Sequence, residues 1–408
     1  MGVLVALLAG ALLLPGGSGA KGAAIRAAKA AKAAKAKTLR HATARVAGGN
    51  PLSGRGMWIW YVSRSSGGSL AAIIATARQY GISTLFIKAG DGAGAWSQFN
   101  PSLVAALHSA GLRVCGWQYV YGNNPVGEAQ VGAQAVREGA DCLMIDAESE
   151  YEGKYIQSQT YLAQLRRLIG NGFPVALAGF PYIDYHPGFP YSVFLGPGGA
   201  QYNTPQMYWV DIGTSVDNVY THTYAYNRVY SRQIDPLGQV YNNPPPGQII
   251  RFRQLSRSYS APGLSWWDWQ EARPSGWRAL AQPVGVIASL TANSALAIIH
   301  RGSKGDLVVW AQEHLLSAGY SVPVSGKFDA ATLAAATAFQ AAHGLGVDGV
   351  IGPLTWQALL RYAPARVTWA KAGARVARAA GGGLVAPVPA SASLRATRDE
   401  LRGTTGAG

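Results

Sequence analysis

The strongest constraint on the fold is a repeated pattern between residues 54 and 282, in which short apolar runs alternate with helical stretches. Eight such runs, many of them rich in aromatic and β-branched residues, predict buried strands. They are residues 57–62, 84–90, 113–121, 141–148, 174–180, 205–211, 237–242 and 264–270. Eight βα units in about 230 residues predict an α/β fold of the (β/α)8, TIM-barrel type. An open doubly wound sheet is the alternative, but no glycine-rich phosphate loop follows any run.

The positive charge of the chain lies mostly outside this central region. The formal net charge is +15; residues 21–46 carry eight Lys or Arg and no acid, and residues 361–408 carry eight Lys or Arg and two acids. The part between them is therefore nearly neutral. Basic segments favour anionic partners such as wall polymers, or are simply solvated linkers. The central region has no basic patch interleaved with aromatic residues, so the sequence does not support nucleic-acid binding.

Residues 1–20 have the features of a signal peptide. Residues 3–14 form an apolar run of the right length, and Ser18-Gly19-Ala20 resembles a cleavage site. No Lys or Arg precedes the run, which departs from the usual pattern, and a short N-terminal membrane anchor is the alternative. We further expect a basic Ala/Lys/Gly-rich linker at 21–53, a connector at 283–300 and a disordered basic tail at 363–408.

Residues 301–362 carry the pattern of a small all-α domain with three helices. Leu307, Trp310, Ala311 and Leu315 fall on one face of the first helix. Gly319 follows that helix, at a position where a left-handed cap suits glycine.

This segment also matches a known pattern along its whole length. The matching positions are Gly305, Asp306, Val308, Gln312, Leu315, Gly319, Gly326, Phe328, Thr332, Ala336, Phe339, Gln340, Gly344, Leu345, Asp348, Gly349, Gly352, Pro353, Thr355, Trp356 and Leu359. In these residues the segment resembles the three-helix peptidoglycan-binding domain of secreted wall hydrolases. The resemblance implies a module that binds peptidoglycan; the alternative is a three-helix domain that no longer binds the wall.

The two cysteines, Cys115 and Cys142, lie in runs that are expected to form neighbouring parallel strands. A disulfide between adjacent parallel strands requires unusual geometry, so we expect two small buried thiols. The seven histidines are scattered without metal-ligand spacing. The sequence therefore predicts no structural metal and no cofactor.

Acidic residues recur where the predicted strands end, which is where barrel enzymes place their chemistry. They are Asp91, Asp146, Glu148, Asp211, Asp268 and Glu271. Asp146 and Glu148 are two residues apart, so both side chains should project from one face of the fourth strand. Such a pair suits glycoside hydrolysis, in which one carboxyl donates a proton and another is ionised. The alternative is a pair of loop-capping acids in a barrel that only binds sugar. Asp91 is alternatively a turn residue, and Glu150 and Glu152 are interpreted as solvated loop charges.

Aromatic residues in the predicted strands fit a sugar site, because flat rings can cover the apolar faces of sugars. Strand alternation turns about half of these rings outward, toward the helices. The residues expected to bind substrate are Trp60, Trp117, Tyr119, Tyr208 and Trp269, together with Asp91 and Asp211.

Three short motifs carry a second resemblance: FIKAGDG at 86–92, IDAES at 145–149 and WWDWQ at 266–270. In them the central region resembles the family 25 glycoside hydrolases, the Chalaropsis-type muramidases. The resemblance implies that Glu148 is the general acid, with Asp146 beside it and Asp268 as a further acid. The first strand, MWIWYV, departs from that family because it lacks the expected Asp.

Together these features predict a secreted, cell-wall-associated bacterial glycoside hydrolase, expected to be a monomer. Its catalytic residues would be Glu148, Asp146 and Asp268, and its C-terminal module would tether it to peptidoglycan. Two alternatives stay open: a non-catalytic wall- or sugar-binding protein with an inactive barrel, and a glycosidase that acts on another exopolysaccharide.

Overall fold

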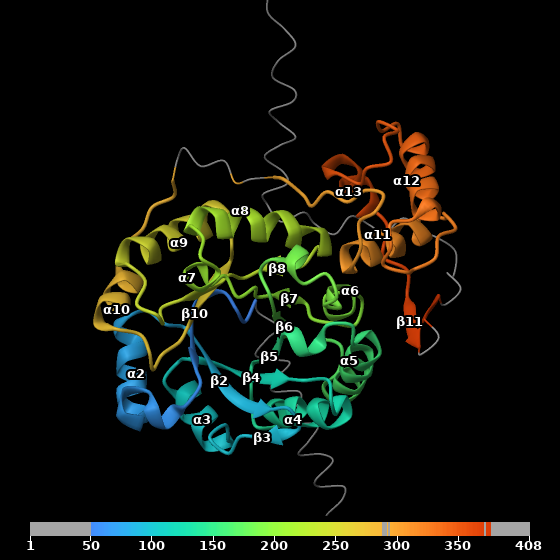
Figure 1. Ribbon diagram of the computed structural model, residues 1–408. Helices are drawn as coiled ribbons and strands as arrows, with labels where there is room; N and C mark the ends of the chain where they lie inside the picture. The colour runs from blue at the N-terminus through green and yellow to red at the C-terminus, as the bar shows by residue number, and fades with distance from the viewer. Residues whose placement is uncertain (1–49, 288–291, 293, 371–372, 377–408) are drawn as a thin grey trace, which may run out of the picture.

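The computed structural model describes residues 50–287, 292, 294–370 and 373–376, and Figure 1 shows them as a barrel-like body with a smaller helical module beside it. The predicted signal peptide, nearly all of the predicted linker and most of the predicted basic tail lie outside these residues. Among the described helices, none has the length and apolar character needed to cross a membrane.

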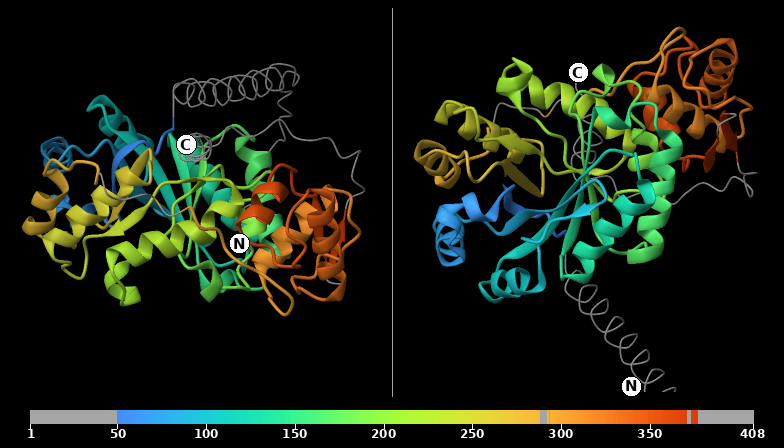
Figure 2. Two further views of the ribbon diagram at one scale, coloured as in Figure 1. Left: turned by 90° about the horizontal axis from the view of Figure 1, so that it is seen from above. Right: turned by 60° about the horizontal axis from the view of Figure 1, so that its bottom comes forward.

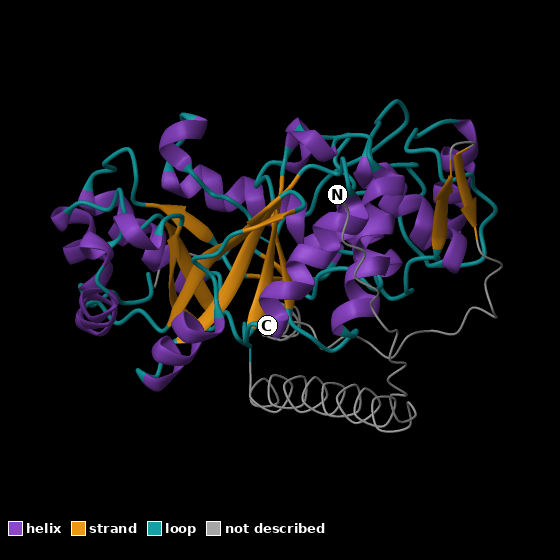
Figure 3. Ribbon diagram, turned by 90° about the horizontal axis from the view of Figure 1, so that it is seen from below, coloured by secondary structure: helices purple, strands orange, loops and turns teal. Residues whose placement is uncertain are grey.

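Parallel strands form the centre of the body, with helices packed around them (Figures 1 and 3). The strands are β1 (Gly54–Ile59), β2 (Thr84–Asp91), β4 (Arg113–Val120), β5 (Cys142–Ala147), β6 (Val175–Ala178), β7 (Tyr202–Asn203), β8 (Gln233–Ile234), β9 (Leu237–Gln239) and β10 (Gly263–Trp267). Their order in the sheet is β8-β7-β6-β5-β4-β2-β1-β10-β9, and the short β3 (Gly94–Ala95) pairs with β2. The ends of this path, β8 and β9, are consecutive pieces of one chain segment, and Gln206 bridges Leu237. The sheet therefore curls round on itself, and the predicted barrel fold is confirmed.

The strands differ from the prediction around the sixth run, and the short β8 was not predicted. Run 205–211 was expected to be the sixth strand, but pairing starts earlier, at Tyr202, and Trp209–Ile212 forms the short helix α7. The indole N–H of Trp209 donates to Gln248 and its ring packs on Phe252. This side chain is thus buried among the outer helices rather than in a strand.

The helices of the body follow the strands as expected for βα units. They are α2 (Leu70–Gln79), α3 (Pro101–Ser109), α4 (Pro125–Arg137), α5 (Tyr155–Ile169), α6 (Tyr191–Phe194), α7, α8 (Val216–Asn227), α9 (Pro246–Ser258) and α10 (Pro274–Ala281). Local sequence explains several starts: Asn100 and Asn124 each cap a helix that begins with proline, and each side chain accepts a backbone N–H of the first turn. Asparagine suits the cap, and proline suits the first helical position.

Strand alternation divides the buried side chains into two sets. The set that fills the barrel interior comprises Leu52, Trp58, Phe86, Cys115, Trp117, Cys142, Met144, Ala176, Ala178 and Leu237. The alternate residues, such as Met57, Ile59 and Ile87, pack with the surrounding helices. An interior filled with large side chains closes the barrel below and leaves room for a site only at its rim.

Cys115 and Cys142 form a disulfide, which corrects the prediction of two free thiols. The two residues are direct partners in the pairing of β4 with β5, and their Cα atoms are 4.6 Å apart. That separation is within the range that a disulfide can bridge, although it lies at the short end. Both side chains point into the barrel interior, so no rotation of either strand is needed to join them.

The C-terminal module consists of α11 (Asp306–Ser317), α12 (Ala330–Ala342) and α13 (Pro353–Leu359), as the sequence pattern predicts. Figure 2 shows it against one side of the body, and Figure 1 shows α11 next to α6. Part of the segment predicted to be disordered is ordered: β11 (Val367–Ala370) and β12 (Gly373–Val376) form a hairpin. The reason is contact with the body, because Trp369 packs on Tyr155 of α5 and its backbone N–H donates to Gln159.

Candidate active site

A hollow of about 500 Å³ opens at the carboxyl ends of the barrel strands. It is lined by Trp58, Trp60, Lys88, Asp91, Trp117, Tyr119, Tyr121, Asp146, Glu148, Glu150, Gln206, Tyr208, Leu237, Tyr241 and Trp267. We call this hollow the cleft. It brings together most of the residues predicted from the sequence: Asp91, Asp146, Glu148, Trp60, Trp117, Tyr119 and Tyr208.

The cleft contains a pair of carboxyl groups held by one amide. The Nε2 of Gln206 donates to Asp146 Oδ1 at 2.9 Å and to Glu148 Oε1 at 3.0 Å. Asp146 is the penultimate residue of β5 and is only 7% exposed, while Glu148 follows two residues later, before the 3-10 helix η3 (Ser149–Tyr151). The predicted common orientation of the two side chains is therefore present. Gln206 was missed by sequence reasoning, and its only signal was its place in the predicted sixth strand.

Burial raises the pKa of both carboxyl groups. The pKa of Asp146 lies well above its usual value because of burial first and the neighbouring Glu148 second, while Lys88 acts in the opposite direction. The pKa of Glu148 is also raised by burial and by Glu150, and the hydrogen bond from Gln206 opposes this. Two buried carboxyls in contact resist losing both protons, so the pair is expected to hold one proton over a wide pH range.

A buried ammonium group lies beside this pair. Lys88 Nζ is 2.6 Å from Asp91 Oδ2, and the Tyr121 hydroxyl donates to Asp91 Oδ1 at 2.8 Å. The rings of Trp96, Trp117 and Trp60 surround the same Nζ at 4.4, 4.7 and 5.0 Å. Aromatic faces attract cations, so these rings and Asp91 together stabilise the ammonium group of a lysine side chain that is only 4% exposed. Asp91 is therefore the partner of Lys88, a residue that sequence reasoning did not single out.

Glu150 also lines the cleft, which corrects its interpretation as a solvated loop charge. It accepts a hydrogen bond of 2.7 Å from the Tyr119 hydroxyl. The other loop acid, Glu152, is not among the residues that line the cleft, and its Oε1 is 2.7 Å from His186 Nδ1.

The tryptophans of the cleft differ in how their ring N–H groups are used. Trp58 donates to Ser265 Oγ at 3.0 Å, and Trp117 donates to the carbonyl of Ile59 at 3.0 Å. Within the described part of the chain, the ring N–H groups of Trp60 and Trp267 have no hydrogen-bond partner, and Trp60 is 36% exposed. A buried indole normally satisfies its N–H inside the protein. Trp60 and Trp267 are thus free to donate to a ligand, whereas Trp58 and Trp117 offer only a ring face.

Asp268 and Trp269, predicted for the site, lie outside the cleft. Asp268 is 0% exposed, and its Oδ1 accepts the backbone N–H of Glu271. Burial raises its pKa to about 7. Trp269 is buried against Trp277 and donates to Ser66 Oγ. Trp267, the last residue of β10, lines the cleft, whereas Asp268 and Trp269 follow the end of the strand and are absent from the cleft lining.

Asp211 is also outside the cleft lining. It lies on α7 rather than on a strand, is exposed, and accepts hydrogen bonds from the Tyr241 hydroxyl and from Asn242 Nδ2. Because Tyr241 does line the cleft, Asp211 orients a cleft residue and does not itself face the hollow.

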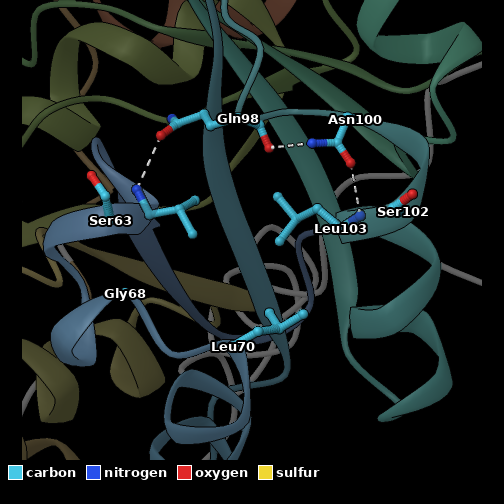
Figure 4. Close-up of a pocket in the computed structure, with 8 residues that line it drawn as sticks. Ser63, Gly68, Leu70, Gln98, Asn100, Ser102 and Leu103 are labelled. Atoms are coloured by element: carbon cyan, nitrogen blue, oxygen red, sulfur yellow. Dashed lines mark hydrogen bonds between the residues drawn. The ribbon is translucent and has the colours of Figure 1, made fainter.

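A second hollow, of about 490 Å³, lies next to the cleft between the loops that follow β1 and β2 (Figure 4). Gln98 connects the two: its Nε2 donates to the carbonyls of Trp60 and Lys88, and its Oε1 accepts the N–H of Val62. The rings of Trp60, which lines the cleft, and Tyr61 stack with their centroids 5.5 Å apart. No carboxylate lines this hollow among the described residues, so it offers surface for a ligand but no acid–base group.

Within the described residues there is no group of three or more His, Cys, Asp or Glu side chains arranged to hold a metal ion. The chemistry that the described cleft offers is that of carboxyl groups next to aromatic rings and one ammonium group.

The comparisons with known proteins separate the two parts of the chain. Residues 304–359 match the family model described as "Putative peptidoglycan binding domain", which confirms the prediction made from the sequence of the module. No curated protein matches the chain. A peptidoglycan-binding protein from Clostridioides difficile is 40% identical over 16% of this chain, with a TM-score of 0.16, and the chain spans 41% of its length.

Several solved structures align with more than half of the chain, and two of them serve as examples. The spore cortex-lytic enzyme SleL of Bacillus cereus is 10% identical over 58% of this chain and 75% of its own, with a TM-score of 0.44. The chitinase ChiC of Aspergillus fumigatus is 14% identical over 54% of this chain and 93% of its own, with a TM-score of 0.42. At such low sequence identities, the functions of these two proteins cannot be assigned to this chain. The similar structures do not point specifically to glycoside hydrolase family 25, and that resemblance stays a prediction from short motifs.

Proposed function

We propose that this protein is a cell-wall-associated glycoside hydrolase that cleaves the glycan strands of peptidoglycan. The observation that carries the proposal is the Asp146–Glu148 pair, bridged by Gln206 on the floor of an aromatic cleft. Buried carboxyls with raised pKa values can donate a proton at neutral pH, and glycosidic oxygens need such a donor. The peptidoglycan-binding module supports a location on the cell wall.

In the proposed mechanism Glu148 is the general acid that protonates the leaving oxygen. Asp146 is within hydrogen-bonding contact of Glu148, so the two groups share a proton instead of flanking a sugar from opposite sides. Enzymes with two flanking carboxylates keep them about 5 to 9.5 Å apart. We therefore assign the role of stabilising the anomeric carbon to the 2-acetamido group of the substrate, which both sugars of peptidoglycan carry. When Glu148 carries the single proton of the pair, Asp146 is its ionised partner. Glu148 donates that proton to the leaving oxygen as the glycosidic bond breaks and the acetamido oxygen bonds to the anomeric carbon. Water then displaces the acetamido oxygen and returns a proton to Glu148, while the Asp146 carboxylate stabilises the positive charge on the sugar.

The cleft walls supply binding in this proposal. Trp60 and Trp117 would cover sugar faces, with Trp267 as an additional ring, and Tyr119 and Tyr208 would contact hydroxyls. Asp91 would act through Lys88, whose charge lies near the acid pair. Asp268, Asp211 and Trp269 have no part in it, because they do not line the cleft.

Export of the protein, its monomeric state and binding of anionic wall polymers by the basic tails remain predictions from the sequence. The Cys115–Cys142 disulfide supports export, because disulfides persist in oxidising compartments outside the cytosol.

The test is digestion of purified peptidoglycan and of soluble N-acetylglucosamine oligosaccharides, with cellulose oligosaccharides as the control that lacks acetamido groups. We expect new reducing ends and defined fragments from the first two and none from cellulose, measured by mass spectrometry. Binding to peptidoglycan without fragment release would favour the alternative of an inactive barrel, which the absence of an acid on β1 makes worth testing. Release of fragments only from another polysaccharide would favour the alternative of a glycosidase that acts on another exopolysaccharide.

The pH dependence of this activity should respond to Glu150. Its negative charge raises the pKa of Glu148, so the change Glu150→Gln lowers that pKa. Glu148 must be protonated to act as an acid, and it will lose its proton at lower pH in the variant. The basic limb of the kcat/KM profile is therefore expected to move to lower pH. Glu138→Gln, at the end of α4 and outside the cleft, serves as the control and should leave the profile in place. If the basic limb of the kcat/KM profile does not move in Glu150→Gln, the charge of Glu150 does not influence the pKa of the catalytic acid.

A further inference from the structure

The first helix of the C-terminal module is buried rather than exposed. Every residue from Asp306 to Leu315 of α11 is buried, including polar ones. Trp310 is 3% exposed, its ring N–H donates to the carbonyl of Val229 at 2.7 Å, and its ring packs on Tyr230 at 5.3 Å. Both partners belong to the body, in the 3-10 helix η5 (Arg228–Tyr230). A module joined to the body only by a flexible linker would have a polar, solvent-exposed surface at this position, so the sequence of α11 is suited to docking on the body.

A single aspartate is the centre of the contact. Asp306 is 0% exposed, and its carboxylate accepts four hydrogen bonds, all from the body. The donors are the Tyr155 hydroxyl at 2.9 Å, the Ser192 backbone N–H and hydroxyl at 2.7 Å each, and the Tyr230 hydroxyl at 2.7 Å. These donors come from α5, α6 and η5. A buried carboxylate needs such partners, and removal of either side leaves polar groups without partners in the interface.

The contact continues from the module to the loop that carries Glu148. The backbone N–H of Asp306 donates to the carbonyl of Pro187 at 2.8 Å, in the loop after β6. In the same loop, Gly188 accepts the N–H of Gly153 at 2.8 Å, and His186 pairs with Glu152 at 2.7 Å. Glu152 and Gly153 directly follow η3, the turn that begins after Glu148.

A second path runs through ring packing. Tyr151 of η3 is fully buried and packs on Phe194 of α6 at 5.1 Å. Ser192, on the same short helix, is one of the groups that bind Asp306. Both paths join the acid-bearing loop to the docked face of α11.

We propose that the peptidoglycan-binding module has a second role, as a brace that holds the Glu148 loop in position, with Asp306 as the positioning residue. The catalytic half of this proposal rests on the proposed function; the structural half does not. In this proposal the module contributes to the structure of the active site. Its orientation relative to the cleft is fixed by the docked contact and not by a flexible linker.

The test uses the full chain with Asp306→Ala, and Leu354→Ala as the control in the same module. Leu354 is 68% exposed, so its loss leaves the docked face intact. Amide hydrogen exchange is the first measurement. We expect faster exchange at 148–154 and 183–190 in Asp306→Ala and native-like exchange there in Leu354→Ala. If Asp306→Ala fails to fold, the milder change Tyr230→Phe with Ser192→Ala removes two of the donors from the other side of the contact.

The second measurement is turnover of a soluble oligosaccharide, for which wall anchoring is irrelevant. Displacement of a catalytic group by about 1 Å can cost up to about 100-fold, so we expect kcat to fall by about 10- to 100-fold. KM should change little, because the aromatic walls come from β1, β4 and β10. If Asp306→Ala releases the module from the body but exchange at 148–154 stays native-like, the brace is overturned. Faster exchange at 148–154 with an unchanged kcat would also overturn it. A native protein without any turnover would instead contradict the proposed function, and the exchange data would still decide the structural half.

Discussion

The change Glu148→Gln is expected to abolish measurable glycan hydrolysis, with a loss in kcat of about 100- to 10,000-fold, the usual contribution of a positioned general acid. Glutamine has the size of glutamate and can still accept the hydrogen bond from Gln206, but it cannot donate a proton to the leaving oxygen. Affinity for the glycan should therefore stay close to native. Mass spectrometry of released fragments measures the first effect, and the change in tryptophan fluorescence on oligosaccharide binding measures the second.

The matched control is Asp268→Asn, an isosteric change at an acid that the sequence pattern also assigned to catalysis. Asp268 is buried outside the cleft, and asparagine can still accept the N–H of Glu271, so native activity is expected. Equal loss in both variants would mean that the fold, and not the acid, had been damaged. Native activity in Glu148→Gln would remove Glu148 from the mechanism.

The contrast between these two acids shows what the sequence can predict about the site. Asp146 and Glu148 were found because they stand two apart at the end of an apolar strand, and period-two alternation puts such residues on one face. The same rule failed at 266–270, where aromatic residues fill consecutive positions and give no sign of which face is inner. Trp267 is the last strand residue and lines the cleft, while Asp268 lies beyond the strand end and is buried outside the cleft lining.

Other parts of the site depend on pairing between distant segments. Gln206 lies between the short β7 and α7, and from there its side chain reaches Asp146, which is 60 residues earlier in the chain. Lys88 is a lone basic residue in an apolar strand, and its partners come from three different strands or loops. The spacing of residues along the chain does not predict such contacts. Propensity and periodicity therefore predicted the barrel and the acid pair, but not the side chains that hold the pair in place.

The disulfide was missed because a bond between adjacent parallel strands was expected to require unusual geometry, and the sequence does not show whether two cysteines are opposite each other in register. On β4 and β5 they are direct partners, 27 residues apart in the chain. Closing a loop of that length restricts the unfolded chain, and the expected stabilisation is about 3 kcal/mol. Reduction should therefore lower the free energy of unfolding by about this amount.

Urea unfolding of the native protein with and without a reductant measures this difference, and thiol titration confirms that the bond has been opened. The double change Cys115→Ala with Cys142→Ala is the control: its stability should be low in both conditions and insensitive to the reductant. Activity at 25 °C should survive reduction, because the pair lies in the barrel interior below the cleft and touches none of the groups proposed for catalysis. A reduced native protein that unfolds at the same urea concentration as the oxidised one would show that the strand pairing alone already fixes β4 against β5.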